Sequence, residues 1–309
     1  MPIVNTDIPI TSELNQCYLQ QIAETYPFTK LEQAGTTDFQ RPIWMLTVGT
    51  GPRKVLFTAA HHANEWITAL VLLKYTEELS AAIQKEGILF GQRAKEMAEA
   101  VTIHLVPLVN PDGVDLVTGA IKPGEAQYGV AQQLAQSYPA IPFPNGWKAN
   151  LLGTDLNLNY PAGWLQAREI KFSQGYTRPG PRDFVGRFPL DQPESKILAD
   201  LTEKLDPDLV LAYHSQGKEI YWQFRDYTVP GAKELGEVMA RVSGYTLADT
   251  PYVSSFAGYK DWFIQNFRRP GYTVEVGSGE NPLPLSQFPE IYRDNVPLLN
   301  IAALGISNG

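Results

Sequence analysis

The sequence predicts an α/β protein: a three-layer α/β/α sandwich with a mixed, mostly parallel central sheet covered by helices on both faces. Short β-rich runs alternate with segments of helical periodicity along the 309 residues, as in proteins whose strands are joined by crossover helices. Polar motifs directly follow several of the apolar runs, which places them at the strand ends where such sheets bind ligands. No repeat, charge block or low-complexity linker divides the chain, so we expect residues 1–309 to form one domain.

The first part of the chain, up to residue 109, contains alternating helical and β-rich segments. Thr11 is a suitable N-cap, and apolar residues follow it at helical spacing. The next two apolar runs are separated by a short turn that contains Gly and Pro. The predicted elements are a helix over 11–26, strands over 43–49 and 54–60, a helix from Asn64 to about Ile83, and a strand over 101–109.

The second part begins with a long segment rich in glycine and proline, from Asn110 to Gly163, which we expect to be irregular. Loops of this length are unusual in a compact domain unless they shape a site. After it, the pattern predicts a strand within 206–217, a helix over 232–244, a strand within 270–279 and a closing helix over 290–306.

The composition excludes several classes of partner. A net charge of −8 argues against nucleic acid and acidic membrane surfaces, because both require a basic footprint on the protein. No apolar run approaches the roughly 20 residues of a membrane span, and the single cysteine, Cys17, excludes an internal disulfide framework. The first residues lack the basic and apolar regions of a secretory signal, so a cytoplasmic location is expected by default. The oligomeric state stays open.

Two of the four histidines stand side by side at the end of an apolar run, and they suggest a metal site. His62 and Glu65 are three residues apart where a strand gives way to a helix, so both side chains can converge on one ion. A catalytic zinc site needs a third protein ligand and keeps a position open for water. His214 ends an apolar strand and is the expected third ligand, whereas His104 lies mid-strand and suits a buried structural role. His61 faces the other side of the pleat.

Four further motifs follow in order, and together they carry a family resemblance. They are "VPLVNPDGVD", "NGWKANLLGTDLNLNYP", "LAYHSQG" and "GYTVEVGSG". From about residue 15 to 305, this order resembles the zinc metallocarboxypeptidases. The stretches "GTDLNLNYPAGW" and "VEVGSGENPLP" are most similar to the bacterial branch that includes the γ-D-glutamyl-L-diamino acid endopeptidases. The resemblance implies a carboxypeptidase-like fold, a single catalytic domain and one Zn²⁺ per chain.

The resemblance also implies roles for individual residues. His62, Glu65 and His214 match the zinc ligands, and Glu275 matches the general base that exchanges a proton with water and the leaving amine. Lys148 occupies the position of an arginine that stabilises the oxyanion in the family. A lysine supplies a point charge where arginine supplies a fork, so the geometry must differ.

Two departures from the family pattern bear on the substrate. Carboxypeptidases hold the terminal carboxylate of the substrate between an asparagine and an arginine. Asn157 is present here, but Leu158 stands in the place of the arginine, and Asn64 replaces another arginine beside the ligand Glu65. Leucine cannot pair with a carboxylate, so terminal-carboxylate capture is lost or moved. An enzyme that cuts the γ-D-glutamyl bond to diaminopimelate or lysine in peptidoglycan stem peptides can do without that anchor.

Other candidate substrate contacts are less specific. Tyr252 and Tyr259 both match the mobile tyrosine of the family, and register favours Tyr252. Asp261 matches a specificity position, where it could pair with the amine of a diamino acid or equally serve as an ordinary acid in the first turn of a helix. The arginines that could hold substrate carboxylates are Arg178, Arg182, Arg187, Arg268 and Arg269, and none is assigned.

Three alternatives to the peptidoglycan endopeptidase stay open. The first is a conventional zinc carboxypeptidase whose carboxylate clamp is rebuilt from the arginines. The second is a zinc deacylase of N-acyl amino acids, which shares the ligand spacing but not the Asn-Pro-Asp-Gly motif. The third is a catalytically silent cell-wall binder, which the intact ligands and base disfavour. A role in muropeptide recycling, in sporulation or at the cell wall is conceivable.

Overall fold

A computed structural model describes residues 2–305, and residue 1 and residues 306–309 lie outside the described part. Within it, eight strands form one mixed sheet in the order β1-β2-β6-β3-β7-β10-β8-β9. The central neighbours β6, β3, β7 and β10 are parallel, and β2 and β8 join them antiparallel. The strands are β1 (Lys30–Thr36), β2 (Pro42–Val48), β3 (Arg53–Ala59), β6 (Val101–Val106), β7 (Leu209–His214), β8 (Glu219–Tyr221), β9 (Thr246–Ala248) and β10 (Gly271–Glu275), with β4 (Ile88–Leu89) and β5 (Gln92–Arg93) in a separate hairpin.

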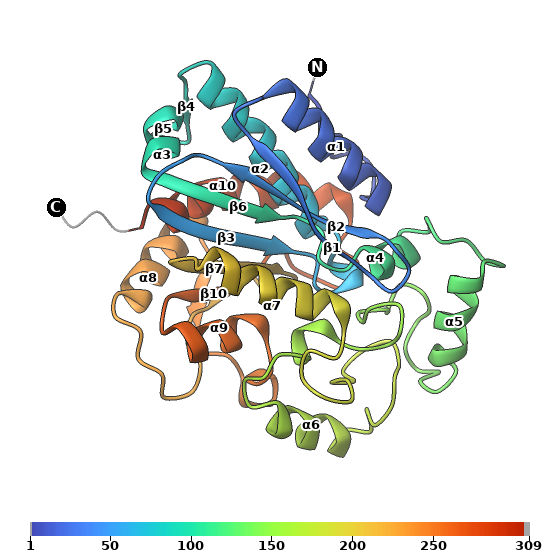
Figure 1. Cartoon of the computed structure of the whole chain (residues 1–309). Coiled ribbons are helices and arrows are strands. Elements are labelled where there is room, and N and C mark those ends of the chain that lie inside the picture. The colour runs from blue at the N-terminus through green and yellow to red at the C-terminus, as the bar shows by residue number, and fades with distance from the viewer. Residues whose placement is uncertain (1, 306–309) are drawn as a thin grey trace.

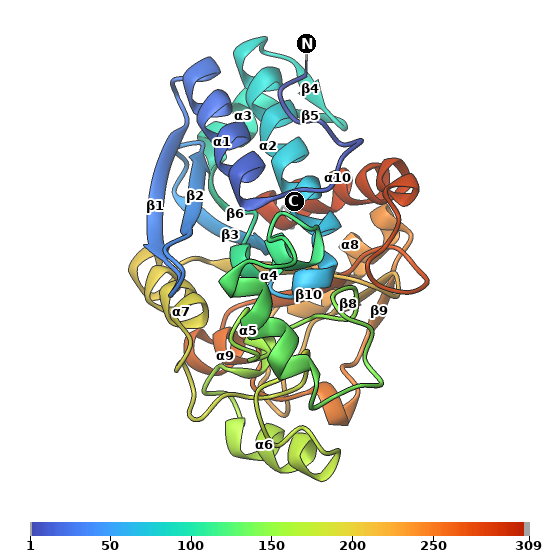
Figure 2. The same cartoon turned by 90° about the vertical axis from the view of Figure 1, so that its right-hand side faces the viewer.

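Helices cover both faces of this sheet, as Figures 1 and 2 show. They are α1 (Ser12–Thr25), α2 (Ile67–Gln84), α3 (Ala94–Ala100), α4 (Pro111–Val117), α5 (Ala126–Ala135), α6 (Trp164–Ser173), α7 (Pro193–Leu205), α8 (Ala232–Ser243), α9 (Tyr259–Phe267) and α10 (Phe288–Leu304). Residues of α1, α2, α8 and α10 share one apolar core with the sheet, and residues of α7 and α9 share the other. None of these helices is both long and apolar enough to cross a membrane. The predicted three-layer α/β/α sandwich is confirmed.

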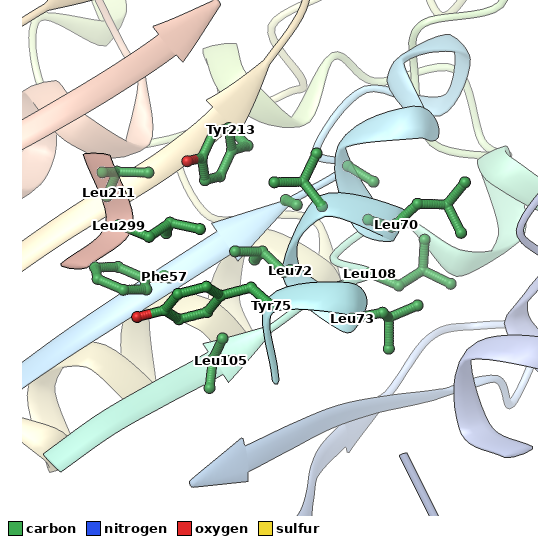
Figure 3. Close-up of a cluster of buried hydrophobic side chains, with 14 of the residues drawn as sticks. Phe57, Leu70, Leu72, Leu73, Tyr75, Leu105, Leu108, Leu211, Tyr213 and Leu299 are labelled. Carbon is green, nitrogen blue, oxygen red and sulfur yellow. The ribbon is translucent and has the colours of Figure 1, made fainter. Parts of the chain in front are cut away.

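The alternation of side chains along the central strands builds the two cores. In β3, Val55 and Phe57 pack into the core that contains α2, whereas Leu56 between them packs into the core that contains α9. Figure 3 shows Phe57 beside Tyr75 of α2 and Leu299 of α10. Because both faces are covered, β3 and β7 are buried along most of their length, as expected for strands at the centre of a parallel sheet.

The sequence-based boundaries agree with the structure where the pattern is strong. Thr11 caps α1 by accepting a hydrogen bond from the Leu14 amide at 3.1 Å, as predicted. The predicted strands correspond to β2, β3, β6, β7 and β10, and the predicted helices to α1, α2, α8 and α10. Ile306, the last residue of the predicted closing helix, lies outside the described residues.

The prediction that residues 110–163 are irregular is wrong in part, because α4 and α5 lie in this segment. The Asn-Pro-Asp-Gly motif begins α4: Asn110 accepts a hydrogen bond from the Gly113 amide at 3.0 Å, and Pro111 occupies the first helical turn. The side-chain amide nitrogen Nδ2 of Asn110 also donates to the His61 and Ala149 carbonyls, at 3.1 and 3.0 Å. The motif therefore joins the loop after β3 to the loop that carries Lys148.

His104 gives the fold a pH dependence that can be measured. Its ring is buried in β6 with Nδ1 2.9 Å from the Thr47 hydroxyl, and burial, with Lys54 nearby, lowers its pKa to about 4. Between pH 6.5 and 4 the unfolded chain binds this proton and the folded chain does not, so stability falls as pH falls. We expect the free energy of unfolding of the wild type, measured with urea relative to that of His104→Gln, to drop by about 2 kcal/mol between pH 7.5 and pH 5. Parallel pH profiles of the two proteins would contradict this assignment.

Candidate active site

The three predicted metal ligands meet at the carboxyl ends of two neighbouring parallel strands. His62 follows β3, Glu65 lies in the 3₁₀ turn η1 (Ala63–Glu65), and His214 is the last residue of β7. The Glu65 carboxylate lies 2.9 Å from Nδ1 of His62 and 2.9 Å from Nδ1 of His214. The two Nδ1 atoms are 3.1 Å apart. All three side chains are buried, and one ligand atom from each lies within 4.8 Å of the others.

The chemistry of this group fits a zinc ion. Nε2 of His62 lies 3.0 Å from Oδ1 of Asp155, and a carboxylate there fixes the tautomer that leaves Nδ1 free to bind metal. Burial alone would raise the pKa of Asp155, but the adjacent His62 holds it well below its ordinary value. Two imidazole nitrogens and one carboxylate are a common donor set of catalytic zinc. Asp155, the acid of the motif "GTDLNLN", is a site residue that the sequence pattern did not predict.

His61 lies beside this group but is not part of it. Its ring is fully buried and stacks on the ring of His214, with centroids 5.5 Å apart. Neither ring nitrogen has a hydrogen-bond partner within residues 2–305. Burial, with His214 and His62 close by, holds the pKa of His61 well below its ordinary value. His61 is therefore a neutral packing residue behind the ligands.

Glu275 and Lys148 face the ligands from two other segments. Glu275 ends β10, where it pairs in register with His214 of β7. Glu275 and Lys148 both line two hollows, the first of which is also lined by His62 and the second by Glu65. Burial and the neighbouring Glu65 raise the pKa of Glu275 to about 8. A cation held by Glu65 would oppose this rise. Burial alone would lower the pKa of Lys148, but Asp155 and Glu65 raise it, so the ammonium stays charged.

The sequence of the chain matches the model of a known family. The model of the zinc carboxypeptidase family matches residues 16–298. The chain belongs to this family. The zinc peptidase is 39% identical over 276 residues to γ-D-glutamyl-L-diamino acid endopeptidase 1 of Lysinibacillus sphaericus, covering 89% of this chain and 67% of that protein. It is 37% identical to the protein YqgT of Bacillus subtilis (strain 168), covering 89% and 72%. Its fold matches the crystal structure of thrombin-activatable fibrinolysis inhibitor with a TM-score of 0.75 at 17% identity, over 98% of this chain and 76% of the other.

The zinc peptidase carries the two departures from the family pattern inside its site. Asn157 and Leu158 lie in the 3₁₀ turn η2 (Leu156–Leu158) and line the first hollow, which is also lined by His62 and Glu275. Oδ1 of Asn157 accepts a hydrogen bond from the Tyr259 amide at 3.0 Å, which ties this turn to the start of α9. Asn64 lines the second hollow, together with Glu65. Leu158 therefore contributes an alkyl side chain to the lining of this first hollow.

The two candidate tyrosines have different environments. Tyr252 lies in the 3₁₀ turn η3 (Tyr252–Ser254), is 71% exposed and packs edge-on against Phe256. It is absent from the lining of the hollow, although its neighbours Pro251 and Ser254 are part of it. Tyr259 is fully buried, with its hydroxyl 2.8 Å from Thr202. Tyr252 thus lies on an exposed turn at the rim, and Tyr259 belongs to the core.

The first hollow is lined by several charged side chains for which the sequence predicted no role. Asp261 lines it, but its Oδ1 is already 2.6 Å from Nζ of Lys260, a residue for which the sequence predicted no role. Of the five candidate arginines, Arg182 lines the hollow, where its Nε is 2.6 Å from Asp183. Arg268 and Arg269 are engaged elsewhere: Arg268 stacks on Tyr227, and Arg269 pairs with Asp206. Lys171 also lines the hollow and pairs with Asp183 at 2.6 Å.

Proposed function

We propose that this zinc peptidase hydrolyses the bond between γ-D-glutamate and a diamino acid, diaminopimelate or lysine, in peptidoglycan stem peptides. Leu158 carries the proposal, because it lines the hollow beside the base at the position where carboxypeptidases clamp a terminal carboxylate. The 39% identity to an enzyme named for this bond supports it. Peptidoglycan fragments as substrates also agree with the many charged side chains that line the site.

Each residue of the site would have a separate role in the proposed reaction. His62, Glu65 and His214 would hold the zinc, which supplies Lewis acidity to the scissile carbonyl and to a water molecule. Glu275 takes the proton from the attacking water and gives it to the leaving amine. Lys148 lines the same two hollows as Glu275 and donates a hydrogen bond to the carbonyl oxygen as negative charge develops there.

The shape of the site suits a substrate that extends on both sides of the cut bond. One hollow is lined by Asn157, Leu158 and Asp261, and the other by Asn64, Asn145 and Asn281. Glu275 and Lys148 line both, so the scissile bond would lie at their junction. The first hollow would take the diamino acid, and the second the γ-D-glutamyl group with the residue before it.

Defined stem peptides test the proposal. Tri-, tetra- and pentapeptide stems are expected to release L-Ala-γ-D-Glu, with the diamino acid at the new amino terminus of the other product, as read by mass spectrometry. An α-linked peptide of similar length is the control and is expected to be cut far more slowly. Release of single C-terminal amino acids, with no cut at γ-D-Glu, would instead support the second candidate.

That second candidate is a conventional zinc carboxypeptidase. It is favoured by Arg182 and Lys171, two cations that line the first hollow and that could receive a terminal carboxylate. Both already pair with Asp183, so an incoming carboxylate would compete with a group in place. A cytoplasmic location stays a prediction. An enzyme in the cytoplasm would act on soluble fragments of peptidoglycan.

A further inference from the structure

Arg182 lies where the two hollows of the active site meet. Of the five candidate arginines, all of which are among the described residues, it alone lines these hollows, and it lines both of them. The residues that share this position with it are Lys148, Tyr221 and Glu275. Arg182 is therefore placed beside the predicted general base and the predicted oxyanion lysine, at the junction where the scissile bond would lie.

Arg182 belongs to a cluster of charged side chains that is not neutral. Its Nε lies 2.6 Å from Asp183, and Nζ of Lys171 lies 2.6 Å from the same carboxylate. The side chains of Asp183 and Lys171 are 9% and 11% exposed, so salt and water screen these charges weakly. Asp155, which accepts a hydrogen bond from the Asp183 amide, lies 3.0 Å from His62. Two cations thus share one carboxylate, and the cluster favours a further anion.

Arg182 has hydrogen-bond donors left for such an anion. Its Nε donates to Asp183, whereas no hydrogen bond or ion pair within residues 2–305 involves its Nη1 or Nη2. Arginine binds carboxylates through N–H groups that point in parallel from its planar fork. Asp183 and Lys171 line the first hollow only. An anion in the first hollow would therefore compete with Asp183, whereas an anion in the second hollow would meet Arg182 without that competitor.

We propose that Arg182 binds the free α-carboxylate of the γ-D-glutamyl residue from the second hollow, and so selects the γ-linkage. The proposal rests on the proposed function and specifies how the acyl side of the substrate is recognised. In a γ-linked glutamate the α-carboxylate stays free on the acyl side of the scissile bond, close to the carbonyl that is attacked. An ordinary α-linked residue uses this carboxylate in the peptide bond itself, and a neutral side chain then leaves Arg182 without an anion.

Two stems that differ by one functional group test the proposal in the wild type. They are L-Ala-γ-D-Glu-meso-diaminopimelate and the same peptide with the α-carboxylate of D-glutamate converted to an amide. The γ-bond and the diamino acid are identical in the two stems. We expect kcat/KM for the carboxylate stem to exceed that for the amide stem by roughly 10- to 100-fold, the value of one charge-assisted hydrogen bond. Equal cleavage of the two stems would overturn the role of Arg182 but leave the proposed function intact.

Binding separates the two proposals when neither stem is cut. Absence of cleavage at γ-D-Glu in both stems would refute the proposed function. The same two peptides are then titrated by calorimetry into Glu275→Gln. Tighter binding of the carboxylate stem would support Arg182 as a carboxylate-binding residue even though the γ-D-glutamyl bond is not the one hydrolysed. Equal affinities for the two peptides would contradict this role.

Arg182→Gln tests the residue itself. The substitution keeps a polar side chain and removes the charge. Asp183 keeps Lys171 as its partner, so no buried carboxylate is left without a cation. We expect kcat/KM for the carboxylate stem to fall roughly 10- to 100-fold, while the value for the amide stem changes little. The preference between the two stems should therefore fall toward parity.

Arg178→Gln is the matched control. It removes an exposed arginine of the same segment that lines neither hollow, and it should keep the preference. An Arg182→Gln protein that folds and keeps the preference would overturn the assignment. An equal loss on both stems would also overturn it, because a purely structural role would affect the two substrates alike. If the variant does not fold, the comparison of the two stems in the wild type decides.

Discussion

Glu275→Gln is expected to reduce kcat by about 10²- to 10⁴-fold, the usual contribution of a general acid–base residue. The substitution keeps the shape of the side chain and removes its ability to take a proton from water. The effect should fall on kcat, because Glu275 is separate from the His62–Glu65–His214 group that would hold the metal. Zinc content per chain and the melting temperature should therefore stay close to those of the wild type. Steady-state kinetics on the preferred stem, with metal analysis of the same preparation, measures both.

Glu219→Gln is the matched control for this prediction. Glu219 lies opposite Glu275 in the antiparallel register of β8 and β10, so the two carboxylates occupy adjacent positions of one sheet. Glu219 accepts a hydrogen bond from the Tyr221 hydroxyl at 2.5 Å and is not part of the group that lines the site beside the ligands. Its variant is expected to lose far less activity. Equal losses in the two variants would contradict the role of Glu275, and a Glu275→Gln protein with full turnover would exclude it.

The predictable part of the fold is the part where burial dictates the pattern. The strands β3 and β7 are apolar along most of their length because both faces are covered, and the sequence shows them directly. β1 was missed because it is an edge strand with the sequence "KLEQAGT", in which no residue is fully buried and no regular alternation is required. α5 was missed because it buries only Ala131 and Ala135, so it has no broad apolar face.

The site was predictable where the chemistry depends on local spacing. His62 and Glu65 are neighbours in sequence, and His214 and Glu275 each end an apolar run, so their chemical types and positions already indicated a site. Asp155 and Lys260 each contact a residue that is distant in the sequence. The contact of Asp155 with His62 spans 93 residues, and no periodicity in the sequence encodes it. Lys260 and Asp261 are chain neighbours, but both are buried, and this burial results from tertiary packing that the sequence pattern does not show.

The two adjacent histidines provide a second test with a large expected effect, because we predict different functions for them although both are buried imidazoles. His62→Ala is expected to lose bound zinc and to reduce kcat by at least about 10³-fold, since a catalytic metal supplies several kcal/mol of transition-state stabilisation. Its Nδ1 faces Glu65 and His214, and its Nε2 is oriented by Asp155. Added zinc should not restore activity, whereas a chelated wild type should recover when zinc is returned. Metal content and kcat are the measurements.

His61→Leu is the control that makes this result specific to the ligand position. His61 is as buried as its neighbour, but neither of its nitrogens has a hydrogen-bond partner in the described chain, so an apolar side chain of similar volume removes no such bond. Replacing a buried unpaired polar group by an apolar one is close to neutral or stabilising. We therefore expect His61→Leu to keep one zinc per chain and most of the wild-type kcat. Loss of zinc from both variants would mean that the metal depends on the packing of the whole loop after β3, and the assignment of His62 as a direct ligand would lose its support.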